Sequence, residues 1–174
     1  MKLAVGDHVV YASHGVGTVT ARRGAGQEQV VVLEFPEGLS VTLPIETALE
    51  LFRPVSSELD VDRVRKTLRD EAFADEAWRK RLKDTKEKVR DGAAVGLAEV
   101  VRDGAHRENL TAGRGATARL SLSERQLYLK ARRLLANELC ASLGVDSDAA
   151  DDWISDQLNI PAAALGPAAV ARTA

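Results

Sequence analysis

The sequence predicts an α+β protein with two domains: a small SH3-like β-barrel over residues 1–54 and an all-helical domain over residues 58–160. Three observations lead to this fold class. The first part alternates short β-branched runs with Gly and Pro turns, which is typical of a small, strongly bent β-sheet. From residue 58 onward, apolar residues recur at helical spacings of three and four. The formal charge also changes, from −2 over residues 1–53 to +4 over residues 54–145 and −4 over residues 146–174.

Four short strands and a fifth candidate make up the predicted barrel. Gly15 and Gly17 permit a tight turn after the first strand, and Gly24–Gly26 closes the next hairpin. Pro44 lacks a backbone N–H, so it marks the fourth strand as an edge of the sheet. Such an exposed edge is either protected or used to pair with a strand of another protein. The strands are expected at Asp7–Tyr11, Gly17–Ala21, Gln29–Phe35, Leu39–Leu43 and Leu51–Arg53.

Three of the helices expected in the second domain precede residue 120. Ser57 or Asp60 caps the first, and the second ends near Gly92. The third is more apolar and is expected to end near Gly104. The residues from there to Leu120 are rich in Gly, Thr, Ala and Arg, which predicts a long mobile loop.

The longest helix is expected over Ser123–Leu143. The capping box Ser121–Glu124 opens this helix, and Gly144 closes it. A shorter, acidic last helix follows, capped by Asp146 or Ser147. The helical domain is therefore predicted to end with two consecutive helices joined by a tight turn.

The second helix, around residues 77–90, is the candidate functional element, with Asp75 as its predicted N-cap. At helical spacing, one face carries Trp78, Leu82, Thr85 and Val89. The neighbouring face carries Arg79, Lys83, Lys86 and Arg90. Seven cations stand against two anions between the first and last of these arginines. Such a surplus on one helix suits a polyanion such as nucleic acid.

Other residues add to this reading or compete with it. A second cationic surface is predicted on the longest helix, from Arg125, Arg132 and Arg133. For both helices a plainer interpretation stays open, because a tryptophan on an apolar stripe usually belongs to a core and a cationic face is often only solvated. Trp153 lies on an acidic segment and is expected in the core. Cys140 is expected to be a buried thiol.

The chain lacks the residue patterns of an enzyme. His8, His14 and His106 form no metal-ligand spacing with the single cysteine, and the glycine runs lack the lysine of a phosphate-binding loop. No secretory signal and no membrane-length apolar run is present. We expect a cytoplasmic protein with no catalytic residue, metal, cofactor or small-molecule substrate. Residues 161–174, rich in Ala and Pro, are expected to be disordered.

Several segments together resemble one known family. The opening Val5–Tyr11 reads V-G-D-H-V-V-Y and is followed by H-G-V-G at His14–Gly17. Further matching segments are Leu43-Pro44, Trp78–Arg81, Ala98–Asp103 and Lys130–Arg132. Over about residues 3–160, the chain resembles the CarD/CdnL family of bacterial transcription regulators. The opening alone also looks like the polymerase-interacting module of transcription–repair coupling factors, and the helical half with its tryptophan separates the two.

This resemblance implies a Tudor-like β domain that docks on the β subunit of RNA polymerase, and a helical domain that contacts promoter DNA at the upstream edge of the −10 element. It also implies that a tryptophan wedges into the minor groove where the bubble opens, which stabilises the open complex without enzymatic activity or a cofactor. The implied DNA-binding residues are Trp78, Arg79, Lys80, Lys83, Lys86, Lys130, Arg132 and Arg133. The implied polymerase-binding residues are Arg22, Arg23, Val41, Thr42, Leu43 and Pro44, with Thr42 at a position where relatives have arginine.

The alternative hypothesis is a protein–protein adaptor on RNA polymerase that makes no direct contact with DNA. The net charge of −2 for the whole chain motivates it. The discriminating feature is whether the cations between Arg79 and Arg90 are exposed or paired with acidic neighbours. In either case, two unlike halves with separate partners suit a monomer.

Overall fold

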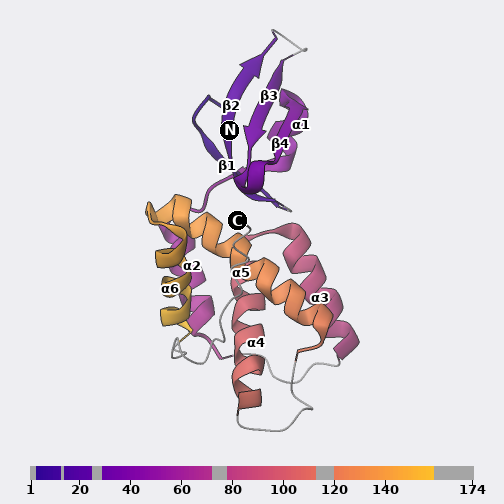
Figure 1. Ribbon diagram of the computed structural model, residues 1–174, viewed down its shortest axis with the longest axis vertical. Helices are drawn as coiled ribbons and strands as arrows, with labels where there is room; N and C mark the ends of the chain where they lie inside the picture. The colour runs from indigo at the N-terminus through magenta and orange to yellow at the C-terminus, as the bar shows by residue number, and fades with distance from the viewer. Residues whose placement is uncertain (1–2, 13, 25–28, 72–77, 113–119, 159–174) are drawn as a thin grey trace, which may run out of the picture.

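The protein is described by a computed structural model over residues 3–12, 14–24, 29–71, 78–112 and 120–158. Figure 1 shows a sheet at one end of the long axis and a group of helices at the other. The sheet and its one helix form the β module, up to residue 54, and the helices from residue 58 form the helical module. The predicted α+β fold class, a Tudor-like sheet followed by helices, is thereby confirmed. No helix in the described ranges is long and apolar enough to cross a membrane.

The β module contains a five-stranded antiparallel sheet in the order β4-β3-β2-β1-β5. Its strands are β1 (His8–Tyr11), β2 (Gly15–Arg23), β3 (Val30–Glu34), β4 (Ser40–Pro44) and β5 (Phe52–Pro54). Each strand lies within two residues of its predicted position. Strand β4 is at one edge of the sheet, as its terminal Pro44 indicated. The hairpin residues 25–28 lie outside the described part of the chain.

Alternate residues of the central strands form the core of the β module, because successive side chains of a strand point to opposite faces. Val19, Val31 and Leu33 have 0% exposure. Phe35 covers Gly17, where an added Cβ would lie 2.6 Å from the ring carbon Cε1. This glycine is therefore needed for close packing. The core cluster comprises Leu3, Val9, Val19, Val31, Leu33, Phe35, Ala48 and Phe52.

One helix of the β module was not predicted. Helix α1 (Ile45–Leu51) follows Pro44 directly and buries Ala48 completely. Its seven residues are too few to establish a helical period, and two of them are β-branched. Leu51, which was expected to begin the last strand, instead ends this helix. The short 3-10 helix η2 (Pro36–Gly38) connects β3 to β4.

The helical module contains α2 (Glu58–Arg69), α3 (Trp78–Asp91), α4 (Ala94–Ala112), α5 (Leu122–Leu143) and α6 (Ser147–Gln157). Ser57 caps α2 through a capping box with Asp60. The predicted capping box at Ser121–Glu124 opens α5, and Gly144 ends it with a left-handed φ of 67°. Asp146 caps α6. These local signals placed the helix ends correctly, because each satisfies backbone groups that the helix itself leaves unpaired.

Helix α4 is longer than predicted. The glycine at position 104 was expected to end it, but α4 continues to Ala112. Gly104 instead lies beside Tyr128 of α5, where an added Cβ would be 2.5 Å from the ring carbon Cδ2. The glycine thus permits close helix packing and does not act as a cap. The rest of the predicted loop at residues 113–119, and the tail at residues 161–174, lie outside the described residues.

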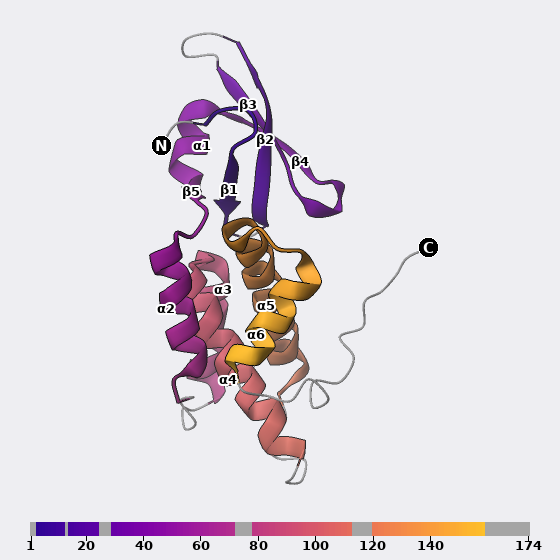
Figure 2. The same cartoon turned by 90° about the vertical axis from the view of Figure 1, so that its left-hand side faces the viewer.

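A single apolar cluster forms the core of the helical module. All five helices contribute to it, α3 only through Val89, and Val64, Leu97 and Leu135 are among its least exposed members. Trp153 and Cys140 are partly buried and pack against this cluster. Burial raises the pKa of the Cys140 thiol. Figure 2 shows that the ends of β1 and β2 abut the upper part of the helical module at α5.

Candidate nucleic-acid interface

The apolar face of helix α3 is buried near its C-terminal end and exposed at its start. Val89 is 3% exposed, whereas Trp78 is 49% exposed, and Leu82 and Thr85 between them are half-buried. The predicted stripe therefore shares one face, but burial decreases along it towards the N-terminus. The indole at the first residue of the helix presents a large apolar surface to solvent.

The neighbouring cationic face of α3 is also open to solvent. Four side chains at helical spacing are exposed: Arg79, Lys83, Lys86 and Arg90. Lys80 is exposed as well. Lys83 lies 4.0 Å from Glu87 one turn on, and both side chains are more than half exposed, so that pair screens little of the charge. An aromatic ring with cations at the following positions therefore forms one outward surface, which we call the α3 surface.

Two other cations of α3 pair with carboxylates of neighbouring helices and hold the helix in place. The Nε of Arg81 lies 2.9 Å from a carboxylate oxygen of Glu124 on α5, and the ammonium of Lys88 lies 2.8 Å from Glu99 on α4. Burial opposes the ionisation of Glu124, but hydrogen bonds from the Ser121 N–H and hydroxyl and from Arg81 lower the pKa of this carboxyl below its usual value. The sequence identified Glu124 only as a capping residue, and no local signal linked it to α3.

The cations predicted on α5 lie in different environments. Arg133 is exposed and Lys130 is half-buried, but Arg132 is only 8% exposed. Its guanidinium donates two hydrogen bonds to the carboxylate of Asp151 on α6, at 2.6 and 2.7 Å, and a third to the Ser155 hydroxyl at 2.7 Å. Although burial works against the charged form, the Asp151 carboxylate keeps the pKa of Arg132 above its ordinary value. Arg132 therefore joins α5 to α6, and its charge is already neutralised within the module.

The residues expected to meet the polymerase lie together at one end of the sheet. The registers align Arg22 with Val31 and Leu43, and Arg23 with Val30 and Pro44. Residues directly opposite each other in neighbouring strands point to the same face. Leu43 and Val41 pack against the core, so Thr42, Pro44 and Arg23 belong to the opposite, exposed face.

Arg22 has contacts within the β module. Its guanidinium donates to the carbonyl of Leu3 at 3.0 Å and to the side-chain oxygen of Gln29 at 2.7 Å. It thereby ties the N-terminal segment to the β2–β3 hairpin, whereas Arg23 is exposed beside it. In the part of the chain that the structure describes, no group of three potential metal-ligating side chains comes together.

Comparison with known protein families covers both modules. Residues 63–155 match the model of the CarD C-terminal domain, and residues 3–56 match the model of the CarD-like/TRCF RID domain. The first match alone spans more than half of the 174 residues. The two matches follow the same order as the two modules of the structure. Proteins with CarD-like domains are non-enzymatic transcription regulators that interact with RNA polymerase. The chain belongs to the CarD/CdnL family.

Proposed function

We propose that this protein docks on the RNA polymerase β subunit through its β module and contacts promoter DNA through the α3 surface. The contact lies at the upstream edge of the transcription bubble and stabilises the open complex. The observation that carries this proposal is the position of Trp78, which is 49% exposed at the first residue of a helix that is anchored near its other end by the buried Val89.

An exposed indole at a helix start is suited to act as a wedge. Inserting an apolar side chain between base steps costs a few kcal/mol of unstacking. That cost is smallest where the duplex is already opening, so the wedge selects the edge of a bubble over closed DNA. The buried Val89 near the other end of α3 anchors the helix against the core, so the helix stays in place when its first residue contacts DNA.

The exposed cations of α3 supply attraction that does not depend on sequence, because phosphate contacts position a protein without reading bases. Arg79, Lys83 and Lys86 are the proposed phosphate contacts, with Lys80 beside them and with Lys130 and Arg133 on α5. Arg132 is left out of this set, because its guanidinium is bound to Asp151. So small a number of exposed cations predicts weak binding to DNA alone.

Docking on polymerase would offset this weakness by raising the local concentration of DNA near α3. The proposed polymerase-binding surface is the free edge of β4 with Thr42 and Pro44, beside Arg23. Unpaired backbone groups at a sheet edge are suited to pairing with a strand of another protein. The polymerase contact would thus lie on the β module and the DNA contact on the helical module.

The test is the lifetime of the open complex on a ribosomal RNA promoter, measured by competitor challenge with and without saturating protein. We expect the wild-type protein to lengthen this lifetime. Trp78→Ala should lose most of the increase while polymerase binding is kept, because only the wedge is removed. An unchanged lifetime with wild-type protein, or full activity of Trp78→Ala, would contradict the proposal.

A matched control is Leu143→Ala. This residue is also an exposed apolar side chain, at 38%, but it lies at the far end of α5. At about 1.5 Å per residue, it is about 28 Å along the helix from the Glu124 contact with α3. Leu143→Ala should lengthen the open-complex lifetime as the wild-type protein does. A loss equal to that of Trp78→Ala would indicate a general effect of surface truncation.

A protein–protein adaptor without DNA contact remains the competing function, and the internal pairing of Arg81 and Lys88 favours it to that extent. The two are separated by the salt dependence of affinity for a polymerase complex on forked DNA. Phosphate contacts make affinity fall with added salt. A response no steeper than for polymerase without DNA would support the adaptor.

A further inference from the structure

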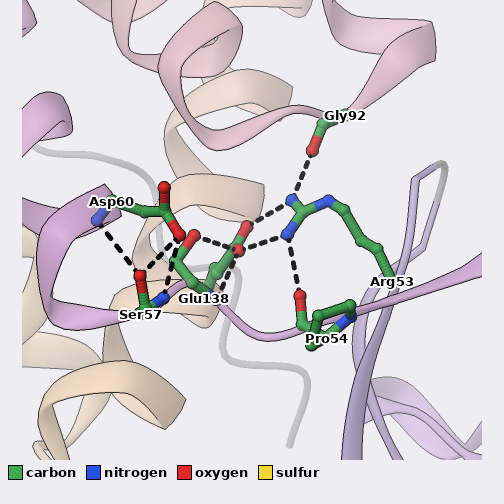
Figure 3. A network of polar contacts seen from close by, with 7 residues as sticks. Arg53, Pro54, Ser57, Asp60, Gly92 and Glu138 are labelled. Atoms are coloured by element: carbon green, nitrogen blue, oxygen red, sulfur yellow. Dashed lines mark hydrogen bonds and ion pairs between the residues drawn. The ribbon is translucent and has the colours of Figure 1, made fainter. Parts of the chain in front are cut away.

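An ion pair joins the two modules where the β module passes into the helical module. Figure 3 shows Arg53, at the middle of β5, reaching Glu138 in the C-terminal half of α5. The two residues are 85 positions apart in the sequence. Glu138 is 1% exposed, and its environment is provided by residues of both modules and of the short link between them.

Both oxygens of the Glu138 carboxylate accept hydrogen bonds from across the junction. Arg53 donates from Nη1 at 2.6 Å and from Nη2 at 2.7 Å, in a bidentate arrangement. Ser56 donates from its hydroxyl at 2.6 Å and from its backbone N–H at 3.1 Å. Paired, bidentate contacts to a buried carboxylate are geometrically specific, because a carboxylate removed from water is stable only with its partners in place.

Arg53 also binds the end of α3. Its Nη2 donates to the carbonyl of Gly92 at 2.7 Å, and Gly92 is the first residue after that helix. Gly92 has a φ of 68°, and an added Cβ would lie 2.6 Å from the carbonyl oxygen of Ala12, in the turn between β1 and β2. The base of α3 is therefore in contact with two separate parts of the β module.

The link between the modules is held along its length. Pro54 accepts a hydrogen bond from Arg53 at 3.2 Å, Ser56 binds Glu138, and Ser57 caps α2 with Asp60. Figure 3 shows these contacts side by side. No residue of this short link is a glycine, and Pro54, Ser56 and Ser57 all have hydrogen bonds, so the link itself gives little freedom of rotation.

The two modules do not share one hydrophobic core. Each module has its own hydrophobic cluster, and among the described residues Val10 and Val16 are buried outside both clusters. The sheet register places these two valines and Arg53 on one face of the sheet. Because no single apolar core joins the modules, polar contacts of defined geometry help to set the angle between them.

We propose that Arg53 and Glu138 are positioning residues, which set the angle between the β module and α3 and thereby the place where Trp78 meets DNA. This inference rests on the proposed function. Because a helix rises about 1.5 Å per residue, the 14 residues of α3 carry Trp78 about 20 Å from Gly92. At that radius, a rotation of about 10° at the junction displaces the indole by about 3.5 Å, close to the 3.4 Å spacing of bases along a strand.

The angle between the modules is followed by the distance between two spin labels, which pulsed electron–electron double resonance measures. The labels are placed on exposed positions of each module, Glu50 on α1 and Glu87 on α3, in a Cys140→Ala background. The doubly labelled protein with the wild-type Arg53–Glu138 pair should give one narrow distance distribution. Arg53→Gln and Glu138→Gln should each broaden or shift it, because the carboxylate or the fork that fixes the angle is lost.

Two further variants keep this measurement interpretable. Arg63→Gln removes an exposed arginine that pairs within α2, and should leave the distribution unchanged. Arg53→Lys keeps a positive charge beside Glu138, but one ammonium cannot replace a fork that reaches Glu138 and Gly92 together. Arg53→Lys should give a distance distribution of intermediate width. It should also remain folded if Arg53→Gln does not. A lower melting temperature with an unchanged distance distribution in the folded state would show that the pair is merely structural, which overturns the proposal.

Open-complex lifetime then connects the angle to function. At equal polymerase occupancy, Arg53→Gln and Glu138→Gln should lose most of the wild-type increase, and Arg63→Gln should keep it. A broadened distribution with a full increase would overturn the positioning role. If the wild-type protein lengthens no lifetime, the proposed function is wrong, while the distance distribution still decides whether the pair sets the angle.

Discussion

The outer face of α3 and the face between α5 and α6 contain similar residues but differ in what surrounds them. Each has a tryptophan nearby and arginines or lysines at helical spacing. On α3, Trp78 is 49% exposed and the cationic row faces solvent. On α5, Arg132 is 8% exposed and bound to Asp151. Helical spacing therefore identifies which residues share a face, but an acidic neighbouring helix decides whether that face is available to a partner.

The two tryptophans follow the same division. Trp153 is half-buried against the helical core, and the Arg65 guanidinium lies 5.7 Å from its ring centre, within cation–π range. Trp78, at the first residue of its helix, is 49% exposed. A ring whose face is already in contact with a cation of its own module is less suited to stacking on a base.

Among substitutions that distinguish the two regions, Arg132→Ala is expected to have the largest effect, a loss of folding stability. Breaking a buried ion pair costs about 3–5 kcal/mol. Because the Asp151 side chain is 44% exposed, water can solvate it in part, and we expect a loss of about 2–3 kcal/mol. Urea unfolding followed by circular dichroism measures this. A loss of DNA contact without any loss of stability would show instead that Arg132 acts on the surface.

Glu124→Gln tests the ion pair that holds α3, since Glu124 anchors this helix through Arg81. Losing charge-assisted hydrogen bonds should lower stability by about 2 kcal/mol at neutral pH. The pKa of the Glu124 carboxyl is lower in the folded state than its unfolded-state value of 4.5. Such a carboxyl stabilises the folded state at pH values above 4.5, and this stabilisation is lost as the pH falls through the folded-state pKa. The wild-type protein should therefore lose more stability than Glu124→Gln below about pH 4.5. Parallel pH profiles of the two proteins would contradict this.

The smallest effect is expected for Lys86→Gln, on the exposed face of α3. Folding stability should change by less than about 0.5 kcal/mol, as for most surface substitutions. With polymerase present, the slope of log affinity for forked DNA against log salt should fall by up to about 0.9, the value for one phosphate contact. Lys66→Gln, an equal change of charge on the exposed side of α2, is the matched control. Equal effects of both substitutions would indicate only a general influence of net charge.

Local signals predicted much of the fold. The cap expected at Ser57 or Asp60, the capping box at Ser121–Glu124 and the glycine at position 144 placed helix ends, since each acts on backbone groups within a few residues. The same local reasoning failed at Gly104, which is a packing position against Tyr128 rather than a helix end. It also missed α1, whose seven residues carry too short a pattern.

The candidate site was predictable only as far as its chemistry is local. The shared face of Trp78 and Val89 follows from spacing alone, but the decrease in burial between them depends on how α4 and α5 cover the helix. The burial of Arg132 depends on an aspartate 19 positions away, and the Arg53–Glu138 pair joins residues 85 positions apart. Neither pairing has a spacing that a single sequence would reveal.

The central claim is that the indole of Trp78 unstacks bases at the upstream edge of the bubble. Its most direct test is the fluorescence of 2-aminopurine placed at that edge in forked promoter DNA bound by polymerase, since this base brightens when it loses its stacking neighbours. At equal polymerase occupancy, we predict a rise on adding the wild-type protein and little or none with Trp78→Ala. An equal rise with both proteins would contradict the account.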